Sequence, residues 1–273
     1  MGPDPVVPPA PAGTGTWLHG IVPASVAGTL VPVAGLADTP VRVVRGSGLA
    51  AVFSAVPLDE YGEQPLRRNL EDLVWLERAA RAHHRVVDAL ARTGPVLPAR
   101  LATVHTDERR LAGLLRDRRA DLTATLARLT GHQEWGVKGY LLPGGPPSGA
   151  GGATPATAEA VGGTGAGAAY LRRRRAQLQA RETGQQAAAH RAAAVHAELA
   201  GHAAEARRHA PQDQRLSGAR FPMALNGAYL VPVEGIGGFR TAVAALAARY
   251  PALRLELTGP WPPYSFIAGH SES

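Results

Sequence analysis

The chain has 273 residues and a formal net charge of +7, and it contains no cysteine. This length is enough to bury one large core or two modest ones. The lack of cysteine excludes disulfide scaffolds, thiol catalysis and cysteine-bound zinc or iron–sulfur centres, and it fits a cytosolic protein. Lys138 is the only lysine, so the basic charge is almost all arginine. This bias makes arginine abundance less informative about function than usual.

The first residues carry no sign of a membrane segment. Residues 1–14 are rich in proline and glycine, and we expect a flexible tail there. A bilayer-spanning helix needs about 20 predominantly apolar residues, and prolines and glycines interrupt the uncharged stretch from Val6 to Ala37 too often to provide one. No basic segment precedes this stretch, as a signal peptide would require. We therefore expect a soluble protein.

An N-terminal domain that combines strands with helices is expected over residues 15–131. Its first strand is predicted at Trp17–Val22, where Pro23 ends it. Two β-rich segments, Val41–Arg45 and Leu49–Val56, flank a short turn that contains glycine. This arrangement predicts a hairpin.

A long helix is expected to follow the hairpin. Pro65 suits the first helical turn, where its missing N–H is not needed. The apolar stripe then includes Leu73 and His83 and continues to Leu90, at alternating steps of three and four residues. Gly94 ends the helix. Because His83 lies on the stripe, we expect it to be a core histidine.

A second helix is expected from Asp107 to Leu129. Thr106 is positioned as its N-cap, and the acidic residues of its first turn suit the positive end of the helix dipole. Gly131 ends this helix and with it the N-terminal domain.

The C-terminal domain is expected over residues 132–268, interrupted by a flexible linker at about 143–167. Almost every linker residue is glycine, alanine, proline, serine or threonine. Around the linker the pattern alternates strands and helices, which is compatible with a small open sheet covered by helices on one face. The strands are expected at 135–142, 223–231 and 253–257, and the helices at 168–210 and 237–249.

The patterns that usually carry chemistry are incomplete. The glycine-rich run Gly163–Gly167 lacks the Gly-Lys-Ser/Thr that a phosphate loop needs. The histidines are not spaced as metal ligands on one helix face, and no Gly-x-Ser-x-Gly elbow occurs. We expect no catalytic, cofactor-binding or metal-binding residues, and hence no enzyme.

The run Arg172–Arg175 is the strongest hint of nucleic-acid binding. Between Tyr170 and Ala210 the chain has eight arginines and three glutamates. Four consecutive arginines wind around a helix instead of lining one face, however, and no aromatic residues alternate with them to stack on bases. A basic nucleic-acid-binding regulator that uses the Arg-rich helix near 170–210 is therefore the alternative hypothesis, and we do not expect nucleic acid as the partner.

The scarce aromatic residues gather near the C-terminus. They either pack on the protein's own sheet or contact a partner, since aromatic side chains dominate many interfaces. The candidate partner-binding residues are Trp261, Tyr264 and Phe266, together with Trp75 if that side chain projects off the helix stripe.

Several segments, taken in order, resemble the gas vesicle proteins of the F and L type. The segment Leu18–Ala24 is similar to the opening strand of that family, and Leu66–Leu90 resembles its signature helix. Further similar segments are GLAAVFSAVPLDEY (48–61), GPVLPARLATVHTDE (94–108), QEWGVKGY (133–140), AYLRRRRAQ (169–177), LNGAYLV (225–231) and RLELTGPWPPYSF (254–266). The resemblance covers most of the chain outside the tail and the linker.

The resemblance implies an α+β protein of two domains, each a small sheet packed with helices, of which the C-terminal one is ferredoxin-like. It also implies a cytoplasmic assembly protein or minor structural component that is associated with gas vesicles and binds the small hydrophobic main shell protein. Other gas vesicle proteins are further candidate partners, and neither catalysis nor a lipid membrane is implied. Because exposed apolar surface favours aggregation, such a protein could mask the shell subunit with a strand edge or an apolar groove.

Overall fold

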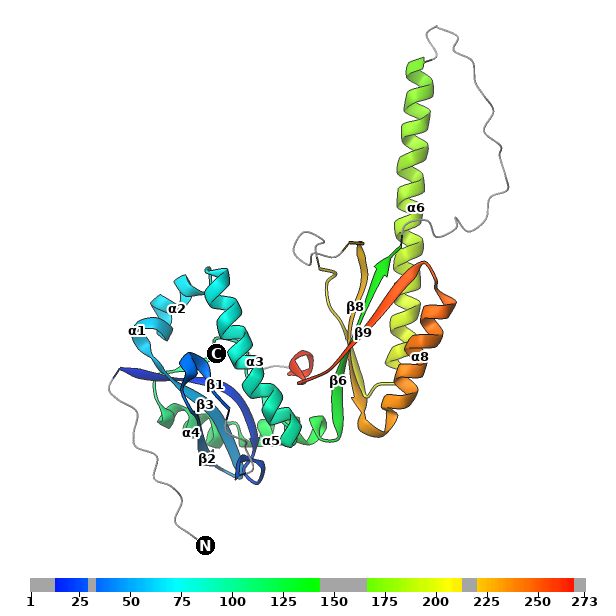
Figure 1. Cartoon of the computed structure of the whole chain (residues 1–273). Helices are drawn as coiled ribbons and strands as arrows, with labels where there is room; N and C mark the ends of the chain where they lie inside the picture. Colours follow the sequence, from blue (N-terminus) through cyan, green and yellow to red (C-terminus); the bar gives the residue numbers. More distant parts are fainter. Residues whose placement is uncertain (1–12, 29–32, 143–165, 213–219, 268–273) are drawn as a thin grey trace. The chain divides into compact units, whose positions relative to one another are not determined.

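The computed structural model describes residues 13–28, 33–142, 166–212 and 220–267 (Figure 1). The chain divides into two compact units: residues 1–134 with 260–273 form unit 1, and residues 135–259 form unit 2. Each unit combines a sheet with helices, so the expected α+β class is confirmed. Most of the expected tail and linker lies outside the described residues, and the expected domain ranges stay predictions.

Unit 1 is built on a sheet with the strand order β2-β3-β1-β4, in which β5 also pairs with β1. Its strands are β1 (Thr14–Pro23), β2 (Val41–Gly46), β3 (Leu49–Pro57), β4 (Leu97–Pro98) and β5 (Val104–His105). β2 and β3 form the expected hairpin, with Gly46 opposite Leu49. Ser47 and Gly48 make the turn with φ angles of 57° and 80°, the positive values that a two-residue hairpin turn requires.

Helices cover both faces of this sheet. After β3 come α1 (Leu58–Tyr61), α2 (Glu63–Asn69) and α3 (Leu73–Thr93), and after β5 come α4 (Glu108–Asp117) and α5 (Arg119–Leu129). α3 lies across one face, whereas α4 and α5 lie on the other (Figure 1). Two 3-10 turns, η1 (Val26–Gly28) and η2 (Leu36–Asp38), lie between β1 and β2.

The expected helix from Pro65 to Gly94 is two helices, so that prediction was wrong in part. α2 ends at Asn69, and α3 begins after Asp72, whose Oδ1 accepts hydrogen bonds from the backbone N–H groups of Val74 at 2.9 Å and Trp75 at 3.3 Å. This N-cap restarts the helix with a different face toward the core. Leu73 of the expected stripe is consequently 78% exposed, whereas Trp75 is buried.

The expected helix from Asp107 to Leu129 is likewise divided. Its backbone leaves the helical region at Arg118, with φ −111° and ψ 19°, between α4 and α5. Asp107, instead of the predicted Thr106, caps α4, because its Oδ1 accepts the backbone N–H of Arg110 at 3.0 Å. The break lets α5 follow the sheet separately from α4.

The core between α3 and the sheet is aromatic at one end and aliphatic at the other. Trp17 packs edge-on against Tyr61 with ring centroids 5.9 Å apart, and Trp75 belongs to the same cluster. Val52 and Leu90 belong to the aliphatic cluster. Burying each such side chain contributes about 1.5–3 kcal/mol, so α3 is the element that closes unit 1.

Unit 2 has the strand order β7-β8-β6-β9. In chain order its elements are β6 (His132–Leu141), α6 (Ala166–Ala200), β7 (Glu205–Arg208), β8 (Met223–Pro232), the 3-10 turn η3 (Val233–Gly235), α8 (Ile236–Arg249) and β9 (Leu253–Trp261). This βαββαβ order is the one that a ferredoxin-like fold requires, and the ferredoxin-like assignment itself stays a prediction. Leu199 of α6, Phe239 of α8 and Tyr229 of β8 are among the buried residues that join the helices to the sheet.

α6 is shorter at its C-terminal end than the expected helix 168–210. It ends at Ala200, and β7 follows, with Glu205 opposite Leu230 of β8 and Arg208 opposite Gly227. Gly201 lies at the end of the helix, where glycine is the least costly residue. Pairing with β8 therefore outweighs the helix preference of this alanine-rich segment.

The described residues after β9 belong to unit 1 and pack within it. The 3-10 turn η4 (Tyr264–Phe266) is held by Glu134, which accepts hydrogen bonds from the Ser265 backbone N–H at 2.8 Å and hydroxyl at 2.6 Å. Arg128 donates to the Phe266 carbonyl oxygen at 2.7 Å. Three charge-assisted hydrogen bonds thus fix the turn to the end of α5 and the start of β6.

The Asp72 cap supplies a stability test. Asp72→Ala is expected to lower the free energy of unfolding by about 1 kcal/mol, because two N–H groups of α3 lose their acceptor. Urea unfolding followed by tryptophan fluorescence would measure the change. Glu71→Ala, at the exposed neighbouring position, is the matched control, and an equal loss in both variants would contradict the capping role.

Candidate partner-binding site

A buried polar cluster fixes the middle of α3 to the sheet. The Trp17 indole N–H donates to His83 Nδ1 at 3.0 Å, so the imidazole proton lies on Nε2, which donates to the Ala99 carbonyl oxygen at 3.2 Å. His83 is 3% exposed, which confirms the prediction of a core histidine. Burial favours the neutral imidazole and is the main reason that the pKa of His83 falls to about 4, whereas the hydrogen bond to the Ala99 carbonyl oxygen acts in the opposite direction.

A second histidine lies beside His83. The β1–β3 register shifts between Leu18 and Gly20, so His19 is the extra residue of a β-bulge and its side chain reaches the α3 side. Its ring lies 5.2 Å from the His83 ring, and its Nε2 is hydrogen-bonded to the Ser54 hydroxyl at 2.9 Å. Burial, and then repulsion from His83, hold the pKa of His19 well below its usual value. Sequence reasoning missed this residue, since the bulge leaves no local signal.

The C-terminal aromatic residues lie against one flank of α3. The Trp261 ring is 5.9 Å from the His84 ring, and the Tyr264 ring is 6.2 Å from it. Trp261 is 44% exposed, Tyr264 is partly buried and Phe266 is fully buried. Burial, followed by the charges of Asp88 and Glu134, raises the pKa of Tyr264. Of these three predicted residues, Trp261 offers the most accessible ring.

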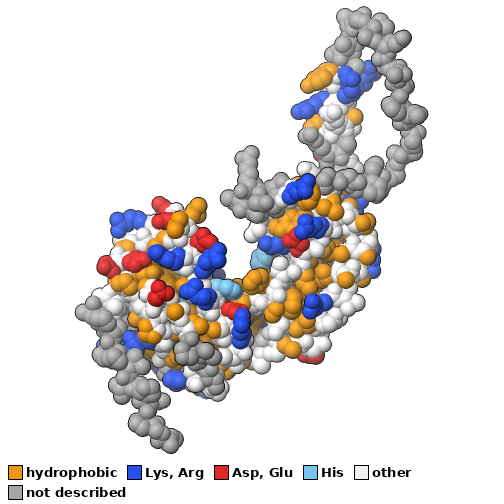
Figure 2. All heavy atoms as spheres, viewed as in Figure 1, with side chains coloured by type: hydrophobic (Ala, Val, Ile, Leu, Met, Phe, Trp, Pro, Cys, Tyr) orange, Lys and Arg blue, Asp and Glu red, His pale blue; other side chains and the backbone are white. Residues whose placement is uncertain are grey.

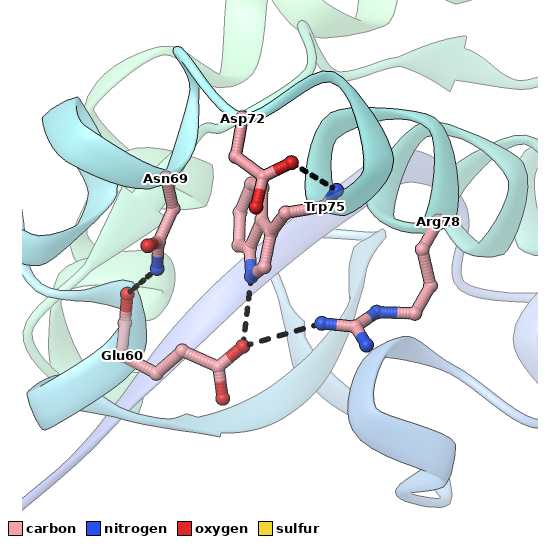
Figure 3. A network of polar contacts seen from close by, with 5 residues as sticks. All are labelled: Glu60, Asn69, Asp72, Trp75 and Arg78. Carbon is pink, nitrogen blue, oxygen red and sulfur yellow. Dashed lines mark hydrogen bonds and ion pairs between the residues drawn. The ribbon is translucent and has the colours of Figure 1, made fainter.

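Trp75 does not project off the core, and the condition under which it was a candidate is therefore not met. The side chain is 7% exposed, and its indole N–H donates to Glu60 Oε1 at 2.8 Å (Figure 3). The same oxygen lies 3.9 Å from Arg78, and Asn69 donates to the Glu60 backbone oxygen at 3.0 Å. This network explains the burial of Trp75, because its one polar atom has an acceptor inside unit 1.

An apolar hollow follows the other flank of α3. Val86, Ala89 and Leu90 of α3 line it, and helix periodicity places these residues roughly opposite His84. We call the hollow the valine groove. It has a volume of about 530 Å³ and is lined by Ala27, Val33, Ala34, Asp38, Thr39, Pro40, Val41, Val43, Val52, Val86, Ala89 and Leu90. Its walls are aliphatic apart from Asp38 and Thr39.

A more polar hollow of about 570 Å³ shares Asp38 with the valine groove. Val74, Arg78, Arg81 and Arg85 are among the α3 residues that line it. The two hollows therefore lie one after the other along α3. The hollow nearer the start of the helix has charged walls, and the valine groove that follows it has aliphatic walls.

The outer strand of the sheet borders the valine groove. β2 is the terminal strand of the order β2-β3-β1-β4, and within the described residues it pairs with β3 alone. Val41 and Val43 pack toward the aliphatic core on the α3 side. Arg42 faces the other side, where its guanidinium lies 3.0 Å from Glu108 and over the Phe53 ring. The groove thus combines aliphatic walls with a strand edge.

The described residues hold neither a metal-binding group nor a helix that could span a membrane. No group of three or more histidine, aspartate or glutamate side chains in the described ranges could hold a metal ion. None of the described helices has the length and hydrophobicity that crossing a bilayer requires. The run Arg172–Arg175, on which the nucleic-acid hypothesis depended, is exposed on α6.

Comparisons with known proteins place these features in a family. The family model described as "Gas vesicle synthesis protein GvpL/GvpF" matches residues 15–268. The chain is 41% identical over 238 residues to gas vesicle protein L of Streptomyces sp. (strain CB03234), covering 87% of this chain and 86% of that protein. It is also 41% identical over 46 residues to gas vesicle protein F1 of Halobacterium salinarum, covering 17% of this chain and 22% of that protein.

Solved structures share the fold at lower sequence identity. The crystal structure of GvpF from Anabaena sp. PCC7120 aligns with a TM-score of 0.60 and 18% identity, covering 95% of this chain and 98% of that one. GvpF from Microcystis aeruginosa aligns with the same score and identity over 93% and 98% of the two chains. At this identity the comparison supports the fold alone.

Phe266 is fully buried and Trp261 is partly exposed, so removing each ring should change stability by different amounts. Phe266→Ala is expected to lower the free energy of unfolding by about 3–5 kcal/mol, because it removes a fully buried ring. Trp261→Ala is expected to cost less than about 1 kcal/mol, because that ring is partly in solvent. Urea unfolding of both variants measures the difference. Equal losses would show that the assigned burial is incorrect.

The lowered pKa of His83 predicts a loss of stability in acid. Between pH 6.5 and about 4 the unfolded chain binds a proton on His83 that the folded chain does not, so the free energy of unfolding should fall by about 3 kcal/mol over this window. The lowered pKa of His19 acts in the same direction. Urea titrations of the wild type and His83→Gln from pH 7 to pH 4 test this. The variant should lose less stability, and identical pH profiles would rule out the assignment.

Proposed function

The chain belongs to the GvpL/GvpF family of gas vesicle synthesis proteins, and from this premise we propose that it binds the main gas vesicle shell protein and supports vesicle assembly. In this role it acts in the cytoplasm, at growing gas vesicles, as an assembly protein or minor structural component. It performs no bond-making chemistry of its own.

The physical need for such a protein arises from the shell subunit. A small hydrophobic subunit that leaves the ribosome before its neighbours are in place exposes apolar surface, and this favours aggregation. A partner that covers this surface reversibly keeps the subunit available for assembly.

The observation that carries the proposal is the valine groove beside the edge strand β2. An added strand can hydrogen-bond to the edge of β2, which provides affinity without regard to sequence. Alternate side chains of that strand would point to one face and lie over the aliphatic walls formed by Val41, Val43 and Val86. Each aliphatic side chain buried there contributes about 1.5–3 kcal/mol before the costs of association.

The C-terminal aromatic segment is the second surface for a shell contact. Trp261 and Tyr264 lie on the flank of α3 opposite the groove and offer a partly exposed aromatic patch. An aromatic anchor of this kind can serve an interface, but the patch has no strand edge beside it. We therefore assign the main contact to the groove and a supporting contact to Trp261.

Conservative substitutions in the groove test the proposal. The double variant Val41→Thr/Val43→Thr is expected to reduce retention of co-expressed shell protein about tenfold, because two hydroxyl groups would be buried against an apolar partner. Val44→Thr is the control for one such exchange, since it makes the same chemical change on the opposite face of β2. Quantitative pull-down of the shell protein, with thermal unfolding of each variant as a folding check, measures the effect.

Two results would contradict this assignment. Undiminished retention by a folded Val41→Thr/Val43→Thr protein would remove the groove from the interface. If Trp261→Ala abolished retention while the groove variant did not, the C-terminal aromatic patch would be the main contact.

A further inference from the structure

The N-terminal part of α6 extends beyond the sheet of unit 2 (Figure 1). The C-terminal part of the helix packs on that sheet through Ala188, Ala192, Val195 and Leu199, which are all buried. From Tyr170 to Gln179, in contrast, every side chain is exposed to solvent. We call residues 170–179 the projecting segment of α6.

Helix propensity explains why this segment is helical without support from packing. Leucine, arginine, alanine and glutamine, which are all good helix formers, make up residues 171–179. Helices that gain no tertiary packing are only marginally stable in water. A partner that packs along the projecting segment would therefore stabilise it further.

One face of the projecting segment has a chemical pattern of its own. Leu171, Arg174, Arg175 and Leu178 follow the spacing i, i+3, i+4 and i+7, which places all four on one side of the helix. Leu171 is 67% exposed and Leu178 is 47% exposed. We call these four residues the Leu–Arg face. Figure 2 shows hydrophobic and basic side chains together on this part of α6.

The Leu–Arg face lies beside the face by which α6 packs on its own sheet. Leu171 and Leu178 precede the buried Ala192 and Leu199 by three repeats of seven residues. A straight helix drifts by about 20° per seven residues, so the two faces are about 60° apart. Within the described residues nothing covers the Leu–Arg face.

Charge decides which partner suits this face. Between Tyr170 and Gln179 the chain has four arginines and no acidic residue. A second copy of the helix would bring arginines against arginines, and like charges at close range are unfavourable. A helix that carries glutamate or aspartate beside leucine-type residues would be complementary in both charge and apolarity.

We propose that the Leu–Arg face of α6 is the docking site for an acidic amphipathic helix of a second protein. The apolar side chains of that helix pack against Leu171 and Leu178, while its carboxylates pair with Arg174 and Arg175. This contact lies in unit 2, whereas the groove proposed for the shell protein lies in unit 1, so the two proposals do not depend on each other.

Two other classes of partner fit the projecting segment less well. Single-stranded nucleic acid requires aromatic residues for base stacking, and Tyr170 is the only aromatic residue in the segment. An anionic bilayer requires a wide apolar face, whereas here two arginines separate the two leucines. The experiment below tests binding of both classes.

A matched pair of double variants of the full chain tests the proposal. Arg174→Glu/Arg175→Glu reverses the charge of the Leu–Arg face. Arg172→Glu/Arg173→Glu makes the same change in net charge on the remaining sides of the helix, because these residues point away from that face. The probe is a synthetic peptide of about four heptads with leucines along one seam and flanking glutamates, and a second peptide has glutamine in place of glutamate.

Fluorescence anisotropy measures binding, and circular dichroism measures the gain in helix. We expect the acidic peptide to bind the wild type and to bind Arg174→Glu/Arg175→Glu at least about tenfold more weakly, with no more than about a threefold loss for Arg172→Glu/Arg173→Glu. The glutamine peptide should bind weakly. Val41→Thr/Val43→Thr should bind the acidic peptide as the wild type does, which separates this test from that of the shell contact.

Several results would overturn the proposal. The first is that the acidic peptide does not bind the wild type. The second is that the two arginine variants lose the same amount of affinity. The third is that single-stranded DNA or phosphatidylserine vesicles bind the wild type more tightly than the peptide does. Self-association of the wild type in sedimentation velocity that disappears in Arg174→Glu/Arg175→Glu would also overturn it, because the occupant would then be a second copy.

Discussion

The hydrogen bond from the Trp17 indole to His83 is the interaction on which unit 1 depends. Through it β1 holds the middle of α3. His83 in turn donates a hydrogen bond to the Ala99 carbonyl oxygen beside β4. Trp17 and His83 are buried, and leaving a buried donor or acceptor unpaired costs about 1–3 kcal/mol. The network therefore fixes both the rotation of α3 and its position along the sheet.

The rotation of α3 determines what each flank of the helix can do. On one flank Ala89 and Val86 form the floor of an aliphatic groove that the edge strand β2 borders. On the other flank His84 contacts Trp261 and Tyr264. A turn of the helix by one residue would rotate it by about 100° and would abolish both surfaces. A rigid helix with two chemically different flanks suits a protein whose proposed work is to hold another protein.

The two units present surfaces of opposite character. Unit 1 offers an apolar groove with a strand edge, which suits a hydrophobic and strand-forming partner of low sequence specificity. Unit 2 offers a helix on which arginines separate leucines, where charge restricts the choice of partner. A chain with both kinds of surface can hold one protein while it engages another. Both surfaces act by binding alone and require no chemical reaction.

Local sequence signals determined much of the fold. The β2–β3 hairpin, the existence of α3 and the core position of His83 follow from periodicity and turn residues close together in the chain. The ordered series of segments also sufficed to indicate the gas vesicle family. Only the tertiary structure decided that Trp75 is buried and that Trp261 is partly exposed, because burial depends on contacts between distant residues. The groove beside β2 is likewise a product of packing, since its walls come from segments that meet only in the folded chain.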